Sequence, residues 1–395
     1  MHALPYWRLS GYYFFYFAFI GAFSPYFGLY LQSLSFSAWD IGLLMSQMQL
    51  MRLFAPYLWG ALADRLAQRV AVVRLAGLLS LLGFSTFFVV SGFGPMLMAM
   101  ALLAFFWSAA LPLVETLTFD HLRAEPARYS RIRLWGSIGF ITAVMGTGAL
   151  LDRVPLPGLL WVIVGTLGGI LVYAWVVPEA LPSESAEAHL PVATIIRQAR
   201  VRALFTACFA MSAAHGALYV FYSIHLSDHH YSKFLVGCLW SLGVVAEIVV
   251  FFFMAGLLRR FGLRTLLLVS FAAAVLRFLL IAWGADWLSV MIFAQLLHGL
   301  TFGAYHAAAI AAVNRWFPGH CQARGQALYS SLSFGAGGLV GSLLSGWTWG
   351  AWGAAPTYAI SSAFALVGLV VVAAWVKKSD LDACAGADSV DRGVT

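Results

Sequence analysis

Long apolar stretches of about 20 residues recur along the whole chain and are separated by shorter polar segments. A helix needs about 20 apolar residues to cross the roughly 30 Å hydrocarbon core of a bilayer. Read in windows of this length, the pattern predicts twelve membrane-spanning helices. Their ranges are 8–32, 39–61, 70–91, 95–119, 133–151, 159–177, 202–225, 234–256, 265–284, 287–312, 325–349 and 356–376. We therefore expect an all-α polytopic membrane protein.

One polar segment, 178–201, interrupts the pattern after the sixth predicted helix and carries prolines, serines and charges. It separates two sets of six predicted helices, 1–177 and 202–376, and a polar tail follows at 377–395. The other connections are short, which leaves no room for a catalytic domain outside the membrane. We expect two six-helix bundles joined by a cytoplasmic linker, with a cytoplasmic tail.

Composition agrees with this interpretation, because 62% of the 395 residues are hydrophobic and 10% are charged, against about 25% charged residues in soluble domains. The net charge of +7 would fit a nucleic-acid partner, but the placement of the basic residues explains it better. With a cytoplasmic N-terminus, nineteen of the 23 Lys and Arg residues fall on the cytoplasmic side, and only Arg153 and Lys233 face the other way. This asymmetry is typical of bacterial inner-membrane proteins. We expect both termini in the cytoplasm and no nucleic-acid partner.

Motifs of enzymes and pumps are missing from the sequence. The four cysteines show no CxxC spacing, and HExxH and GxSxG motifs are absent, so neither a metal site nor an intramembrane enzyme is expected. No phosphate-binding GxxxxGK[ST] motif is present, which excludes an ATP-driven pump. A channel is harder to exclude from composition.

Two glutamates and two arginines stand inside otherwise apolar stretches, and a third arginine stands at the mouth of one: Glu115, Glu247, Arg52, Arg277 and Arg133. A charge at bilayer depth costs about 2.5–3.5 kcal/mol even on a favourable scale, so it needs a partner, a water-filled cavity or a function. Because these charges have opposite signs, they indicate a polar cavity through a helix bundle. This is the pattern of a transporter.

Glu247 is the strongest candidate for a proton-carrying group. The low dielectric of a helix bundle disfavours its charged form unless a cation is near, and Arg277 on the next predicted helix could supply that cation bidentately. A glutamate that is either protonated or paired acts as a proton switch. A static ion pair is the alternative interpretation.

The loop after the second predicted helix reads Gly60-Ala-Leu-Ala-Asp64-Arg65-Leu-Ala-Gln-Arg69. It resembles the loop signature of the major facilitator superfamily, in which glycine allows tight packing and an acid–base pair holds the cytoplasmic side closed. The matching loop of the second half, 256–264, keeps basic residues and lacks the aspartate. The recurrence favours a gating role for Gly60, Asp64, Arg65 and Arg69. The resemblance implies two bundles that rock about a midplane site.

Three further segments carry a closer resemblance. They are Tyr129-Ser-Arg131-Ile-Arg133-Leu-Trp135-Gly136-Ser137-Ile-Gly139-Phe140, Leu239-Trp240-Ser241-Leu242-Gly243-Val-Val-Ala-Glu247 and Gln295-Leu-Leu-His298-Gly-Leu-Thr301-Phe302. Together they are similar to the 3-phenylpropionate permease family, a branch related to lactose permease. The resemblance implies a monomeric proton symporter that imports a small aromatic monocarboxylate, driven by the proton gradient and without a cofactor. A sugar or nucleoside symporter and a drug or metabolite exporter of the same fold remain alternatives.

The resemblance to lactose permease also implies roles for single residues. Glu115 and Arg133 match a substrate-binding carboxylate and arginine, whereas Glu247, Arg277 and His298 match a substrate and proton-coupling network. For a carboxylate cargo, Arg133 or Arg277 is the expected anion receptor.

Two positions depart from the lactose permease pattern. The sugar-stacking tryptophan is Phe140 here, which argues against a galactoside. The proton-carrying glutamate after the histidine is Thr301, which leaves the proton site open.

Aromatic side chains near these charges are candidates for lining the cavity. They are Tyr12, Tyr16, Phe140, Tyr219 and Trp240. Arg52 is either a second anion contact in this cavity or half of a structural ion pair. Asp120 is expected to pair with Arg123, Arg131 or Arg133.

Overall fold

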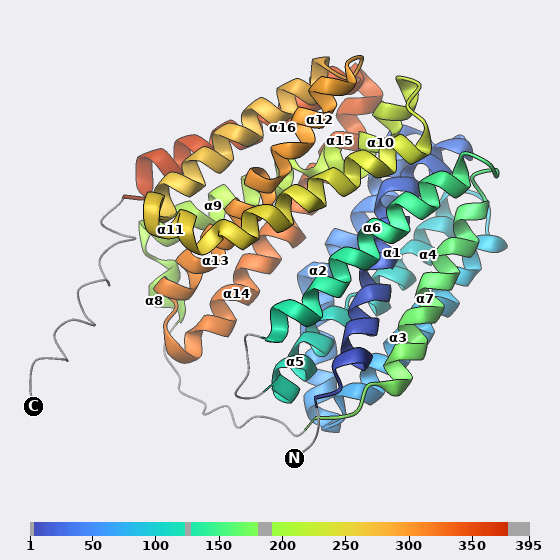
Figure 1. Cartoon of the computed structure of the whole chain (residues 1–395), viewed down its shortest axis with the longest axis horizontal. Helices are drawn as coiled ribbons and strands as arrows, with labels where there is room; N and C mark the ends of the chain where they lie inside the picture. Colours follow the sequence, from blue (N-terminus) through green and yellow to red (C-terminus); the bar gives the residue numbers. More distant parts are fainter. Residues whose placement is uncertain (1–3, 123–127, 181–191, 378–395) are drawn as a thin grey trace, which may run out of the picture. The chain divides into compact units, whose positions relative to one another are not determined.

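The computed structural model describes residues 4–122, 128–180 and 192–377, and these residues fold into helices joined by short connections, with no strand among them (Figure 1). Residues 181–191 of the predicted linker lie outside the described residues. The same holds for Arg123 and for all but the first residue of the predicted tail.

The elements given for the described residues of the first half are α-helices and a short 3-10 helix. They are α1 (Tyr6–Ser33), α2 (Ala38–Leu66), α3 (Arg69–Ser85), η1 (Thr86–Phe88), α4 (Phe93–Trp107), α5 (Ala110–Leu122), α6 (Tyr129–Leu151) and α7 (Gly158–Val176). The start of α2 shows how the sequence sets a boundary. The Ser37 side chain accepts a hydrogen bond from the Asp40 backbone N–H (3.2 Å), and the Asp40 carboxylate accepts one from the Ser37 backbone (3.1 Å), a capping box.

The second half has more breaks than the hydrophobic pattern predicts. Its elements are α8 (Val192–Ile196), α9 (Ala199–Ala214), α10 (Gly216–Asp228), α11 (Lys233–Trp283), α12 (Leu288–Leu296), η3 (Gly299–Ala304), α13 (Tyr305–Trp316), η4 (Gly319–Cys321), α14 (Gln322–Ser330), η5 (Ser331–Gly337), α15 (Gly338–Trp352) and α16 (Ala354–Trp375). Two of these breaks, η3 and η5, are π-helical turns inside longer helices. Such turns are rare and occur frequently at functional sites.

Ten helical stretches among the described residues are long and apolar enough to cross a membrane. One of them, α11, consists of two arms that meet at Gly262, where φ is 75° and ψ is 162°. This left-handed φ is one that glycine adopts without strain. The arms correspond to the predicted helices 234–256 and 265–284, and α2 corresponds to 39–61 although it is not among the ten. All twelve predicted ranges thus fall on helix, whereas twelve membrane crossings remain a prediction.

The chain packs as two compact units. Unit 1 is Met1–Ser185, Gly216–Ser241 and Ser342–Ala354, and unit 2 is Ala186–His215, Leu242–Gly341 and Ala355–Thr395. The division does not follow the predicted bundles 1–177 and 202–376, because α11 and α15 each contribute to both units. The predicted bundle boundaries therefore stay a prediction.

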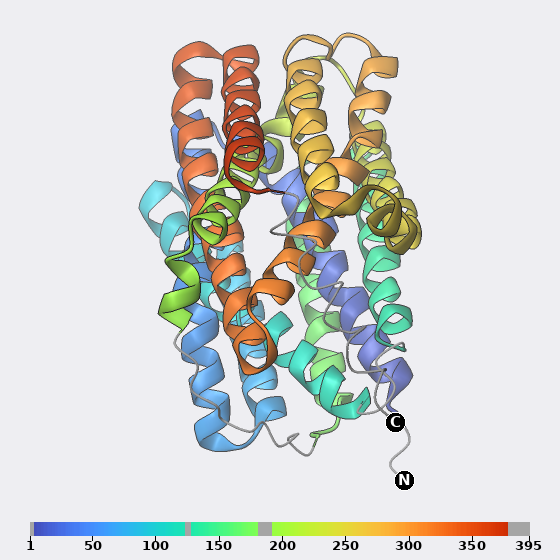
Figure 2. The same cartoon turned by 90° about the vertical axis from the view of Figure 1, so that its left-hand side faces the viewer.

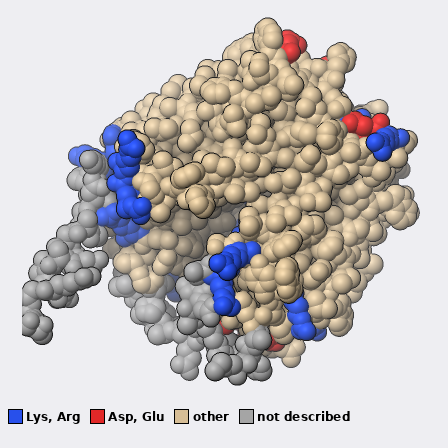
Figure 3. Space-filling model, in the orientation of Figure 1, with Lys and Arg blue, Asp and Glu red and all other residues tan. Residues whose placement is uncertain are grey.

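Within unit 1, α1 packs between α6 and α7 and also against α10 (Figure 1). Most of its side chains are buried, and Tyr12, Phe19 and Phe27 have no exposed surface. Within unit 2, α13 and α14 form a hairpin closed by η4 (Figure 2). On the face shown in Figure 3, charged atoms gather near helix ends, including the break in α11 and the start of α6, and the surface between them is uncharged. This distribution fits helices that face lipid.

Candidate functional site

A cluster in unit 1 contains Glu115 on α5 and Arg133 on α6, two residues predicted from the sequence. The hydroxyl of Tyr129, which begins α6, donates a hydrogen bond to Glu115 Oε1 (3.2 Å). The Tyr129 ring stacks on Phe119 of α5 with 4.7 Å between centroids. The start of α6 therefore holds the Glu115 carboxylate in place.

The guanidinium of Arg133 lies against aromatic rings. Its Cζ atom is 3.9 Å from the centroid of the Phe17 ring and 5.9 Å from that of Tyr13. Arg133 is half-buried and makes no hydrogen bond or ion pair with any described residue. Its five N–H donors are consequently available to a bound anion.

The aromatic residues around this cluster differ in accessibility. Tyr12 and Tyr16 are 0% and 2% exposed, and Tyr16 stacks on Trp107 with 4.7 Å between centroids. Phe140 is 8% exposed. These three rings mainly build the core of unit 1, so their predicted cavity-lining role remains a prediction.

Arg52 on α2 is half-buried and makes no hydrogen bond or ion pair with the described residues. The structural ion pair that the sequence left open for Arg52 is therefore not found within this part of the chain. A second anion contact remains the other interpretation.

Tyr219 and Trp240 lie together, also within unit 1. Their rings stack with 6.1 Å between centroids, and Trp240 Nε1 donates a hydrogen bond to Ser223 Oγ (3.0 Å). Trp240 is buried, whereas Tyr219 is partly exposed. The hydrogen bond fixes the indole ring of Trp240, and the accessible ring of the pair is Tyr219.

The second cluster lies in unit 2 and centres on Arg277, which is fully buried. The guanidinium donates to four neutral acceptors: Ala294 O (2.9 Å), Gln295 Oε1 (3.1 Å), Thr301 Oγ1 (3.1 Å) and His215 Nε2 (3.4 Å). Because His215 Nδ1 lies 2.8 Å from Met211 O, Nδ1 carries the proton and Nε2 is the acceptor. Arg277 is thus held as a fixed internal cation.

Glu247 on α11 lies opposite His298, with 3.9 Å between Glu247 Oε2 and His298 Nε2. The side chains of Glu247 and His298 are 21% and 10% exposed. His298 also stacks on Phe302 with 5.4 Å between centroids. The predicted bidentate contact between Glu247 and Arg277 stays a prediction, because the hydrogen bonds described for Arg277 lead to neutral groups.

The predicted gating loop is open at Gly60, Asp64 and Arg65 and paired at Arg69. Asp64 and Arg65 are exposed, and a Cβ at Gly60 would meet no atom within 4 Å, so the tight packing expected at this glycine is not found. Arg69 forms an ion pair with Asp120 of α5. Arg69 was not among the expected partners of Asp120, and the first turn of α3 brings it to the end of α5. Arg123, one of the expected partners, lies outside the described residues.

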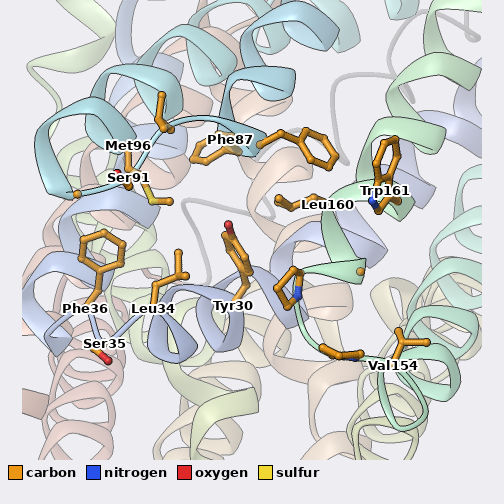
Figure 4. A pocket seen from close by; sticks show the side chains of 16 residues that line it. Tyr30, Leu34, Ser35, Phe36, Phe87, Ser91, Met96, Val154, Leu160 and Trp161 are labelled. Carbon is orange, nitrogen blue, oxygen red and sulfur yellow. The ribbon is translucent and has the colours of Figure 1, made fainter.

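One pocket of about 680 Å³ lies in unit 1, where the α1–α2, α3–α4 and α6–α7 connections meet (Figure 4). Its lining is mainly apolar and aromatic, including Phe36, Phe87 and Trp161, and the Tyr30 side chain points into it. None of the site residues predicted from the sequence lines this pocket. It is therefore separate from both charged clusters.

Several residues that hold the charged groups were not identified from the sequence. Phe17 and Gln295 carry no charge, and nothing in the hydrophobic pattern separates them from lipid-facing or packing residues. Tyr129 is four residues before Arg133 in one of the family-like segments, and this helical spacing is the signal that could have identified it. His215 lies outside the three family-like segments, so the resemblance did not indicate it.

Comparison with known proteins gives a consistent set of relatives. A model described as the MFS_1 like family matches residues 6–360. The chain is 28% identical over 351 residues to a probable 3-phenylpropionic acid transporter of Escherichia coli (strain K12), covering 86% of this chain and 90% of that protein. It is 27% identical over 384 residues to the maltose permease of Geobacillus stearothermophilus, covering 93% of each chain. A putative nucleoside transporter, YegT of Escherichia coli (strain K12), is 25% identical and covers 80% of this chain and 78% of its own.

Solved structures share the fold. The crystal structure of the nucleoside transporter NupG superposes with a TM-score of 0.81 at 18% identity, covering 94% of this chain and 99% of that one. A bacterial homologue of the human lysosomal transporter Spinster, in an inward-facing and occupied conformation, superposes with a TM-score of 0.71 at 16% identity, covering 95% of this chain and 96% of that one.

Proposed function

The chain belongs to the MFS_1 like family of membrane transporters, and we propose that it is a proton-coupled symporter that imports a small aromatic monocarboxylate. It is a multi-pass membrane transporter with a major facilitator fold and not an enzyme. The proposal concerns the cargo, the coupling ion and the direction of transport. The relative named as a probable 3-phenylpropionic acid transporter supports this choice of cargo.

The observation that carries the proposal is the contrast between the two arginines. Arg277 is fully buried and bonded to four neutral acceptors, so it has little to offer an incoming anion. Arg133 is half-buried, lies beside aromatic rings and bonds to no described residue. A guanidinium binds a carboxylate bidentately, and neighbouring rings suit an aromatic cargo. Of the two expected anion receptors, Arg133 is the one we assign.

Glu247 and His298 are the groups we assign to proton coupling. A glutamate at bilayer depth that faces an imidazole can exist as a protonated acid or as a carboxylate beside a hydrogen-bond donor. His215 is held neutral by its contact with Arg277, so it is not the proton carrier. Glu247 would bind and release the proton during each cycle of alternating access.

A nucleoside or sugar symporter is the second candidate, because relatives named as a nucleoside transporter and a maltose permease match the chain at similar identity. Export of a drug or metabolite by the same fold is a further alternative. A polyhydroxylated cargo needs several hydrogen-bonding side chains, whereas the described surroundings of Arg133 are mainly aromatic. This observation favours the aromatic acid.

We further propose a monomer in the bacterial inner membrane with both termini in the cytoplasm. The basis is the asymmetric placement of Lys and Arg along the sequence, which usually sets orientation. A cysteine-labelling map of the connections in intact cells would test this orientation.

Uptake of labelled 3-phenylpropionate by cells with and without the protein, each with and without a protonophore, tests the proposed function. Protein-dependent accumulation that collapses with the protonophore is expected. Unlabelled uridine and maltose serve as competitors, and uptake of either one in place of the aromatic acid would favour the second candidate. No protein-dependent uptake by a protein shown to be inserted would overturn the proposed cargo.

A further inference from the structure

The guanidinium of Arg133 lies over an aromatic ring. Its Cζ atom lies 3.9 Å from the centroid of the Phe17 ring on α1, well within the roughly 6 Å range of a cation–π contact. A ring against the face of a guanidinium leaves the N–H groups, which point outward in its plane, unobstructed. Phe17 is itself half-buried, so the pair is reachable from outside the core of unit 1.

Gly136 provides the space in which this pair sits. It lies one turn after Arg133 on α6, and a Cβ there would be 2.9 Å from Arg133 Nη1 and 2.6 Å from Phe17 Cδ2. Both distances are too short for real contacts, so any side chain at this position would displace the guanidinium or the ring. The absence of a side chain at Gly136 is what lets α1 and α6 place them together.

The nearest carboxylate on α5 does not occupy the arginine. Glu115 accepts a hydrogen bond from Tyr129 (3.2 Å) and makes no direct ion pair with Arg133 in the part of the chain that the structure describes, although the two charges are close enough to interact. Glu115 thus supplies the counter-charge that a cation at this depth needs without taking up the N–H donors of Arg133. The arrangement thus keeps a cation oriented by an apolar ring and leaves its hydrogen-bonding edge open.

We infer that Phe17 and Gly136 form a seat for Arg133, in which Phe17 is a positioning residue that sets the plane of the guanidinium for a cargo carboxylate. The inference rests on the proposed function, in which Arg133 binds that carboxylate. Two parallel N–H···O bonds require the guanidinium and the carboxylate to be nearly coplanar. A ring that fixes the plane lowers the entropy lost when these bonds form.

Binding of 3-phenylpropionate and of the uncharged 3-phenylpropionamide to the purified protein tests the seat. Phe17→Leu keeps an apolar side chain and removes the ring, and we expect it to weaken binding of the acid about 3- to 30-fold, the range of a partly to fully desolvated cation–π contact. Binding of the amide should stay within about twofold, because the amide does not need an oriented cation. Phe17→Trp should retain affinity for the acid.

Control variants separate the seat from general packing. Phe252 on α11 is 82% exposed, and Phe252→Leu should leave both affinities unchanged. Gly136→Ala should weaken acid binding as Phe17→Leu does, by displacing the guanidinium. Equal losses for acid and amide in Phe17→Leu, or equal losses of acid binding in Phe17→Leu and Phe17→Trp, would overturn the seat. Wild-type protein that binds neither compound would instead overturn the proposed function, and the seat with it.

Discussion

The carboxylate of Asp152, at the end of α6, accepts a hydrogen bond from the backbone N–H of Lys233, the first residue of α11 (2.8 Å). A second bond comes from Phe234 N (3.0 Å). Asp152 therefore caps the N-terminus of a helix that lies far along the chain within unit 1. Tyr26 of α1 holds the same turn, since its hydroxyl lies 3.0 Å from Lys233 O and 2.8 Å from Val144 O of α6.

Removing this cap should loosen the start of α11. A carboxylate at a helix N-terminus stabilises by about 0.3–1 kcal/mol, so Asp152→Ala should increase the reactivity of a partly buried thiol nearby about two- to fivefold. Cys238, a partly exposed free thiol on α11, is a native reporter. We expect faster maleimide labelling of Cys238 in Asp152→Ala, measured with the other three cysteines replaced by alanine. Arg153→Ala is the control at the adjacent exposed position, and labelling rates that match in both variants would contradict the cap.

Substitution by lysine should affect stability at Arg277 and cargo binding at Arg133. Lysine has three donors on a point charge and cannot reproduce the fork of a guanidinium. Arg277→Lys should orphan buried acceptors such as Gln295 Oε1, at a cost of about 1–3 kcal/mol, and lower the midpoint of thermal unfolding in detergent. Arg133→Lys should leave that midpoint unchanged and weaken binding of 3-phenylpropionate about tenfold, since one charge-assisted hydrogen bond is lost. Weaker binding of 3-phenylpropionate in Arg277→Lys, with unchanged binding in Arg133→Lys, would mean that Arg277 is the anion receptor.

Glu247→Gln should separate exchange from proton-driven accumulation. Glutamine has nearly the shape of a protonated glutamate and cannot release a proton. We expect the variant to exchange internal for external labelled cargo at close to the wild-type rate and to lose accumulation against a gradient. Loss of both activities in a folded protein would assign Glu247 a structural role.

Ala67 is a site where glycine should stabilise the protein. It ends α2 in the left-handed region, with φ 49° and ψ 30°, a conformation that costs a residue with a Cβ about 1–2 kcal/mol. Ala67→Gly should raise the free energy of unfolding by about 0.5–1 kcal/mol after the added chain entropy of glycine. The matched control is Ala61→Gly inside α2, which should lower it by about 0.5–1 kcal/mol. A decrease for both variants would show that the strain at Ala67 is absent.

The hydrophobic pattern was sufficient to place the helices, because a span across a bilayer requires a long apolar run and little else. The interruptions inside those runs were not predictable in the same way. The turn after His298 and the break between α9 and α10 at His215 depend on neighbouring helices, which re-satisfy the backbone groups that a break exposes. Gly60 and Gly136 both follow Leu-Trp in the sequence, yet only Gly136 has neighbouring side chains where a Cβ would be. The sequence pattern alone therefore does not tell which glycine is required for close packing.

Charged residues in apolar runs could be identified from the sequence, because the free-energy cost of a charge in the membrane makes such residues rare. Most of the side chains that contact them could not be identified in the same way. The partner of a side chain depends on the rotation and register of two packed helices. Asp120 therefore pairs with Arg69, which lies 51 residues away in sequence. For the same reason Arg277 finds Gln295 and Thr301, and Glu247 finds His298.

Transport by purified protein in proteoliposomes with an alkaline interior tests the central claim most directly. The quantity to measure is the initial rate of labelled 3-phenylpropionate entry, after subtraction of the rate in protein-free liposomes, which accounts for diffusion of the neutral acid. We predict a saturable rate that rises with the pH gradient, loses this dependence in Glu247→Gln, and has a weakened apparent affinity in Arg133→Lys. A saturable rate that is indifferent to the gradient, or no protein-dependent entry, would contradict the account.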